Sequence, residues 1–166
     1  MKSAYVISFA ALLASAVPAL AEAAPPPQTF VAEAIEGDIS EIMLGQLAAQ
    51  RAEGREVRDF GHMLSDDHIV AKQAMSALAD ELGVRPPITP AAEARETYTR
   101  LSGLSGIQFD TEFVAYMIKD HQKDIDKFQA EAEAGNGKVS DLAKAQLPTL
   151  QKHLKMAQTL QKQGSQ

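Results

Sequence analysis

Three of the four histidines of this 166-residue chain, His68, His121 and His153, fall on apolar stripes of helical periodicity. A histidine on such a stripe points toward the protein core, where an imidazole can bind Zn, Cu, Fe or Ni. Glu41 lies at the edge of a fourth stripe and would add a carboxylate, completing a tetrahedral set. These four residues are therefore the candidate ligands of one transition-metal ion. His62 lies about 240° around the helix from His68 and is expected at the surface.

The helices that carry these residues are expected to place them at one height. At about 1.5 Å per residue, Glu41 and His68 both lie about 20 Å from the turn at Gly54. By the same count, His121 and His153 lie about 22 and 25 Å from the turn around Asn136. Because each predicted long helix has about 25 residues, all four side chains fall near helix midpoints.

Two interpretations of this layer are open. The four residues could bind a metal ion, or they could form a buried polar layer that fixes how the helices align. A di-iron oxidase centre is disfavoured, because it needs a carboxylate three residues before two of its histidines, whereas Ser65, Ile118 and Leu150 stand at these positions. Asp66 and Asp67 are expected to face solvent, although either could orient His68. Asp124 is a candidate to orient His121.

The periodicity is helical throughout and predicts long helices over 29–52, 55–82, 106–134 and 138–162. Gly54 and the GNG sequence at 135–137 predict tight connections between them. The longer connection begins with RPPITP, which cannot continue a helix. We therefore predict an all-α fold, a ferritin-like four-helix bundle with a long crossover between helices two and three.

Local signals refine the ends of these helices. Gly83 stands where a C-terminal glycine cap belongs, and a short helix over 90–101 would begin after Thr89 as its N-cap. Ser105 and Gln108 have the spacing of a capping box. Pro148 lies inside the last helix and is expected to kink it.

The N-terminus has the pattern of a secretory signal peptide over residues 1–21, with cleavage after Ala21 or, as an alternative, after Ala23. A Pro-rich tether at 22–28, a bundle domain at 29–162 and a tail at 163–166 would follow. We expect a periplasmic or secreted protein with no transmembrane span once the signal is removed. The chain has no cysteine, which excludes disulfides and a lipoprotein anchor.

Charge and motifs narrow the functional classes further. The net charge is −6 with Lys and Arg scattered among acids, which argues against nucleic-acid binding. Phosphate-binding loops, the H-E-x-x-H motif and nucleophile motifs are absent from the sequence, so we favour a non-enzymatic role. The sequence supports a binding module for one metal ion (Zn, Cu or Fe) or, alternatively, an envelope stress or interaction protein with a structural His–Glu layer.

Four segments resemble the bacterial domain-of-unknown-function 4142 family: EIMLGQLAAQ, VRDFGHMLSDDH, LSGIQFDTEFVAYMIKDH and LPTLQKHLKMAQ. The resemblance covers about residues 30–160. It implies a ferritin-like bundle, and members of the family are often labelled exported or outer membrane proteins. The recurrent histidines of the family correspond to His68, His121 and His153, and its helix-one glutamate corresponds to Glu41. The resemblance implies no particular activity.

Overall fold

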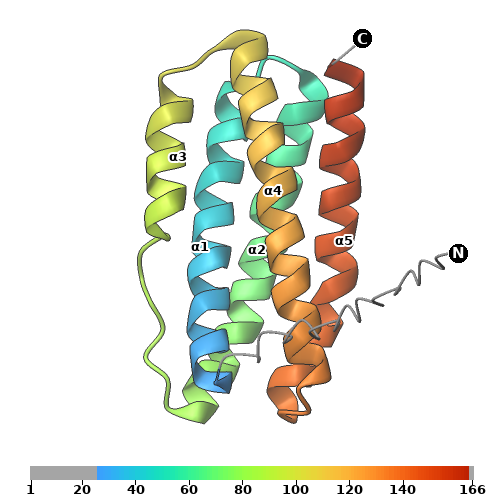
Figure 1. Ribbon diagram of the computed structural model, residues 1–166. Helices are drawn as coiled ribbons and strands as arrows, with labels where there is room; N and C mark the ends of the chain where they lie inside the picture. Colours follow the sequence, from blue (N-terminus) through green and yellow to red (C-terminus); the bar gives the residue numbers. More distant parts are fainter. Residues whose placement is uncertain (1–25, 165–166) are drawn as a thin grey trace, which may run out of the picture.

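The computed structural model describes residues 26–164, whose regular secondary structure consists of five helices and no strand (Figure 1). The signal peptide predicted at 1–21 and the first part of the predicted tether lie outside the described residues, as do residues 165–166. The helices are α1 (Pro27–Arg51), α2 (Arg55–Leu82), α3 (Ala92–Ser102), α4 (Gly106–Glu133) and α5 (Lys138–Gly164).

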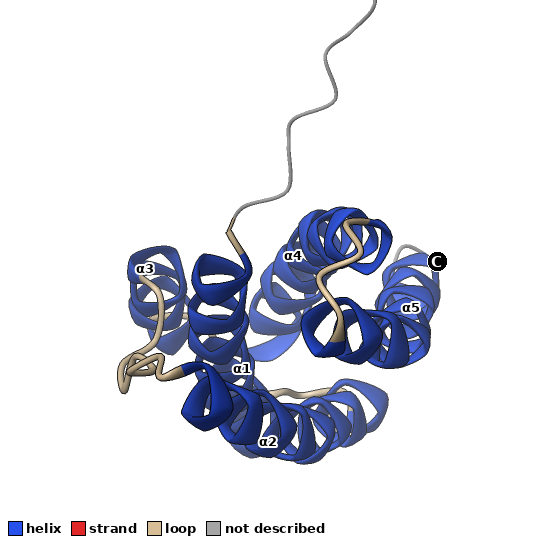
Figure 2. Ribbon diagram, turned by 90° about the horizontal axis from the view of Figure 1, so that it is seen from below, coloured by secondary structure: helices blue, strands red, loops and turns tan. Residues whose placement is uncertain are grey.

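The four long helices lie side by side as two antiparallel hairpins (Figures 1 and 2). α1 packs mainly against α2, and α4 packs mainly against α5. Between the hairpins, the chain returns along the outside of α1, where α3 lies (Figure 2). The contact between hairpins is smaller and is formed chiefly by α2 with α5.

Several helix ends differ from the predicted ones. α1 begins at Pro27, so the end of the predicted tether is helical, because a proline ring suits the first turn of a helix. The predicted start of the short helix at residue 90 is wrong: the backbone N–H of Ala91 donates to Ser40 Oγ at 3.0 Å, and the helix begins at Ala92, two residues later than predicted. α5 continues through Pro148 and ends two residues beyond the predicted position.

One of the three cap predictions is confirmed and two are wrong. The N-cap of α3 is Ala91, not the predicted Thr89. Gly83 is the C-cap of α2, with a left-handed φ of 67°, as predicted. Ser105 is the N-cap of α4, but its side chain makes no capping hydrogen bond, so the predicted capping box is wrong. The next residue, Gly106, has a φ of 61°, which turns the backbone away from capping-box geometry.

Two features fix the geometry of the hairpins. The first is a close approach of α1 to α2 at two glycines: a Cβ on Gly45 would lie 2.7 Å from the carbonyl oxygen of Gly61. The second joins the hairpins, because Asp110 of α4 accepts hydrogen bonds from the backbone N–H groups of Glu53 and Gly54, at 3.0 and 2.7 Å.

The core consists of two apolar clusters with a polar layer between them. Along each long helix, the residues of one cluster precede the layer and the residues of the other follow it. On α4, for example, Met117 belongs to the first cluster and Ile125 to the second, and His121 lies between them. The layer contains five buried ionisable residues: Asp38, Glu41, His68, His121 and His153.

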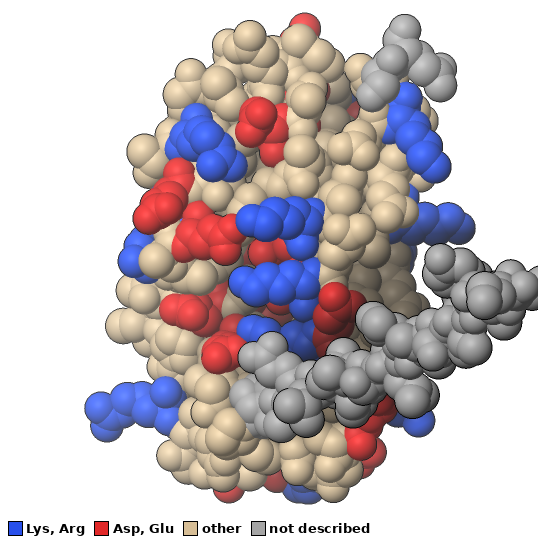
Figure 3. Space-filling view, in the orientation of Figure 1, with Lys and Arg blue, Asp and Glu red and all other residues tan. Residues whose placement is uncertain are grey.

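The surface carries charges of both signs in close alternation (Figure 3). On the face of α4, Lys119 and Lys123 approach Glu93 at 3.2 and 3.9 Å, and Lys127 approaches Glu33 at 2.7 Å. Over residues 26–164, none of the helices combines the length and the apolar character that a membrane crossing requires.

Candidate metal site

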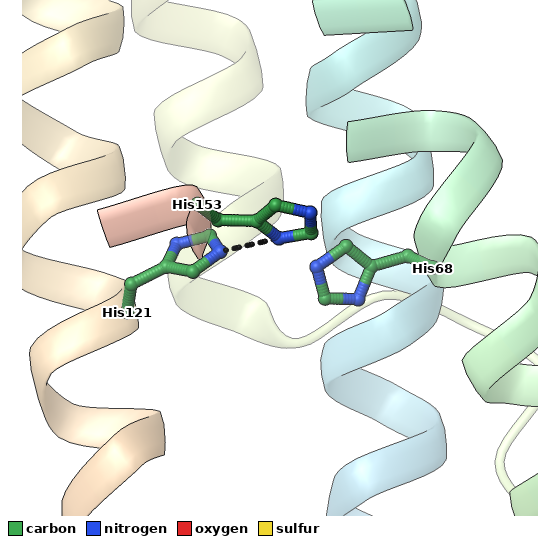
Figure 4. A group of neighbouring side chains, drawn as sticks. All are labelled: His68, His121 and His153. Carbon is green, nitrogen blue, oxygen red and sulfur yellow. Dashed lines mark hydrogen bonds between the residues drawn. The ribbon is translucent and has the colours of Figure 1, made fainter. Parts of the chain in front are cut away.

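The structure brings the three predicted histidines together at the centre of the bundle (Figure 4). His68 comes from α2, His121 from α4 and His153 from α5, and their exposed fractions are 5, 1 and 0%. One ring nitrogen from each residue lies within 4.8 Å of the other two. His62 is exposed, as expected.

Each imidazole is held at one nitrogen by a group that accepts hydrogen bonds. His68 donates its Nδ1–H to Asp38 Oδ1 at 2.8 Å, and His121 donates its Nδ1–H to the carbonyl oxygen of Met117 at 3.0 Å. His153 donates its Nε2–H to Asp67 Oδ2 at 2.9 Å. We assign the tautomers from these partners, since carbonyl and carboxylate oxygens accept.

In these tautomers the remaining ring nitrogens carry lone pairs: Nε2 of His68, Nε2 of His121 and Nδ1 of His153. The last two lie 3.2 Å apart, the contact drawn as a dashed hydrogen bond in Figure 4, which requires a proton between them. Nε2 of His68 also points toward the cluster and has no hydrogen-bond partner among the described residues. Facing lone pairs repel unless a proton or a metal ion lies between them.

The electrostatics of the site disfavour a proton between these ring nitrogens. Burial, together with the neighbouring histidines, lowers the pKa of His121 from 6.5 to about 3. Burial also lowers the pKa of His153 to about 4, although its hydrogen bond to Asp67 opposes the shift. Both rings are therefore neutral at pH 7, which is the state in which imidazole binds metal ions.

Two carboxylates complete the surroundings of the imidazoles. Burial raises the pKa of Asp38, and the hydrogen bond from His68 acts against this rise. Burial also raises the pKa of Asp67, but hydrogen bonds from Lys152 and His153 outweigh it, so the pKa of Asp67 is lowered overall. A carboxylate that accepts from the far nitrogen of a histidine is the usual outer partner of a metal-binding imidazole.

Glu41 is fully buried at the same height but lies behind His121. Its Oε1 is 3.6 Å from His121 Nδ1, the ring nitrogen that faces away from the cluster. Burial, followed by the charges of Asp120, Asp124 and Asp38, raises the pKa of Glu41 well above its usual value. The structure thus unites three of the four predicted ligands and places Glu41 next to one of them. Metal ligation by any of the four stays a prediction.

The partners of the histidines differ from the sequence-based expectation. Asp67, expected to face solvent or to orient His68, orients His153 instead, while Asp66 is exposed. Asp124, a candidate to orient His121, is replaced in that role by the backbone of Met117. Asp38 was not predicted at all. The sequence signal that could have identified it is an acidic residue in an otherwise apolar row of α1. By residue count this position lies within one helical turn of the height of His68.

Fold and site together define a class: an all-helical protein with three buried histidines shared between two helix hairpins. The chain belongs to the family described as a domain of unknown function (DUF4142), whose sequence profile matches residues 12–160. This confirms the resemblance seen in the sequence. No curated protein matches the chain.

Two solved structures have a similar fold. A DUF305 fragment from Deinococcus radiodurans is 20% identical, with a TM-score of 0.74 over 86% of this chain and 99% of that one. A DUF305 protein from Streptomyces coelicolor, described as a candidate secreted protein, is 12% identical, with a TM-score of 0.70 over 84% of this chain and 94% of that one. At such identities the likeness supports the helical fold alone.

Proposed function

We propose that this protein is an exported metal-binding module that holds one transition-metal ion through His68, His121 and His153. The observation that carries the proposal is the convergence of three imidazole lone pairs in a buried site. A cation at this point would turn the repulsion between lone pairs into coordinate bonds. Imidazole ligands suit Zn, Cu or Fe, and the ion would provide a Lewis-acidic centre.

The surrounding side chains support this assignment. Asp38 and Asp67 fix the orientation of His68 and His153 before an ion arrives and would make both imidazoles better donors. Glu41, beside His121, would add a further carboxylate to the outer surroundings of the ion rather than a direct ligand.

The architecture we propose is the ferritin-like bundle of residues 29–162. The single long connection over residues 83–105 supports it, because one long crossover between two hairpins is the ferritin-like arrangement. We further propose export to the periplasm or medium by the leader at residues 1–21. Mass measurement of the mature protein from the cell envelope should give an N-terminus at Glu22 or Ala24, and an intact Met1 would refute export by cleavage.

The test of metal binding uses the mature chain purified without a histidine tag. We expect about one equivalent of metal by elemental analysis, and thermal stabilisation when Zn, Cu or Fe is added after chelation. His68→Gln should abolish both effects, whereas His62→Gln, which changes an exposed histidine of the same helix, should leave them intact. Absence of bound metal together with absence of stabilisation would refute the proposal.

A second candidate function is a structural polar layer. It is favoured by the position of the histidines between the two apolar clusters, since a polar layer there would fix the alignment of the helices. The same variants separate the two roles. A structural layer predicts that His68→Gln destabilises the metal-free protein and alters its packing, whereas a ligand role predicts lost metal with the metal-free fold retained.

A further inference from the structure

A cavity of about 240 Å³ lies against the histidine cluster. Its inner wall includes His68 and His153, together with Asp38 and Asp67, which orient them. It also reaches the surface, because Val70, which is 65% exposed, is part of its lining. The cavity therefore connects the candidate metal site with solvent.

The rest of the wall is largely apolar and built from small side chains. Gly37 of α1, Ala71 and Ala74 of α2 and Ala145 of α5 leave the space open, and Phe128 and Leu150 form larger apolar surfaces. A cavity with a largely apolar wall and a few polar groups is typical of a small-molecule site.

The geometry leaves room for a fourth ligand. Three protein nitrogens occupy three positions of a four-coordinate ion, and sites of this kind keep the last position for an external molecule. His121 does not line the cavity, whereas the other two imidazoles do. An open position of the ion would therefore be reached from the side of His68 and His153, which the cavity borders.

The charges that line the cavity select among external ligands. Four carboxylates line it: Glu33, Asp38, Asp67 and Asp124. The single lining cation, Lys127, is paired with Glu33 at 2.7 Å. An anion entering the cavity would approach the acidic side chains of Asp38 and Asp67, whereas a neutral donor would add no charge.

We propose that the cavity binds a small neutral nitrogen base with an apolar body, whose nitrogen occupies the fourth position of the metal ion. This inference rests on the proposed metal site. Imidazole-type nitrogen is a donor that the same metal ions accept, and a ring with a methyl group fits the small apolar walls.

The test uses the mature chain loaded with Co²⁺, whose visible spectrum reports the ligands of the ion. Titration with 4-methylimidazole should change this spectrum in a saturable way, while the cobalt retained on dialysis stays constant. Acetate at the same concentrations should leave the spectrum unchanged. Ala71→Leu, which fills the cavity, should weaken binding of the base at least tenfold, and Ala115→Leu, outside the cavity, should not.

The outcomes are distinguishable. If Co²⁺ binds but the base leaves its spectrum unchanged, or acetate acts equally well, the cavity proposal is overturned and the metal site stands. An unaltered affinity for the base in Ala71→Leu, with the spectrum of bound cobalt intact, would also overturn it. Failure of the wild type to bind Co²⁺ would overturn the metal site and this inference with it.

Discussion

Asp67→Asn tests the metal site with little disturbance of the fold. In the wild type, Asp67 Oδ2 accepts from His153 Nε2 at 2.9 Å and from Lys152 Nζ at 2.8 Å. The amide oxygen of asparagine can occupy the same place, so the change removes charge rather than volume. Loss of an outer carboxylate partner of this kind weakens metal binding about 10- to 100-fold, which corresponds to about 1.4–2.7 kcal/mol.

The stability of the metal-free protein should change much less. The side chain of Asp67 is one-third exposed and that of Lys152 about half exposed, and an ion pair of this kind contributes about 0–1 kcal/mol. Metal at 100 times the wild-type Kd stabilises the folded state by about 2.7 kcal/mol, and a tenfold rise in Kd reduces this to about 1.4 kcal/mol.

Competition titration with a chromophoric chelator gives the affinities, and urea unfolding with and without metal gives the stabilities. Asp66→Asn is the matched control, because this neighbouring aspartate is exposed. An affinity for metal within threefold of the wild type in Asp67→Asn would refute the role of Asp67 as the outer partner of a metal-binding His153. A loss of several kcal/mol in the metal-free protein would instead favour the structural polar layer.

Three further predictions concern the fold that positions the site. Gly45→Ala should destabilise the protein by about 1–3 kcal/mol in urea unfolding, because its Cβ would meet the backbone of Gly61 at 2.7 Å, whereas Gly37→Ala, with open space around its Cβ, should show no loss. Asp110→Ala should cost about 1–3 kcal/mol, since two backbone N–H groups at the start of α2 lose their acceptor; an unchanged midpoint would contradict this. In the metal-free protein, the pKa of His121 is about 3 in the folded state and 6.5 in the unfolded state. Below pH 6.5 the unfolded state therefore binds a proton that the folded state does not, and the free energy of unfolding falls as the pH falls. Between pH 7 and 5 the wild type should lose about 2 kcal/mol more than His121→Gln, and parallel pH curves for the two proteins would refute the shift.

The helices were predictable because their signals are local. Apolar periodicity and turn residues located the four long helices to within a few residues, and Gly83 marked the end of α2. The errors lie at helix starts such as Ala92, where a tertiary contact with Ser40 decides which residue enters the helix. Spacing within the chain carries no information about such a contact.

The sequence predicted the height of the site residues along the bundle, but not the rotation of each helix about its own axis. Counting residues from each turn placed His68, His121 and His153 at one level, because the rise of a helix is constant. Which carboxylates meet them depends on how each helix is rotated and how the hairpins pack together. For this reason Glu41 was expected in the cluster but lies behind His121, and Asp67 contacts a histidine of the other hairpin.

The division of the bundle into two hairpins has a consequence for the order of assembly. Contacts within a hairpin join residues close in sequence and can form early, whereas contacts between the hairpins close longer loops and are expected later. His68 belongs to the first hairpin, and His121 and His153 belong to the second. An ion bound by all three would bridge the interface that forms last, so it should slow the separation of the hairpins and protect amide hydrogens along that interface from exchange.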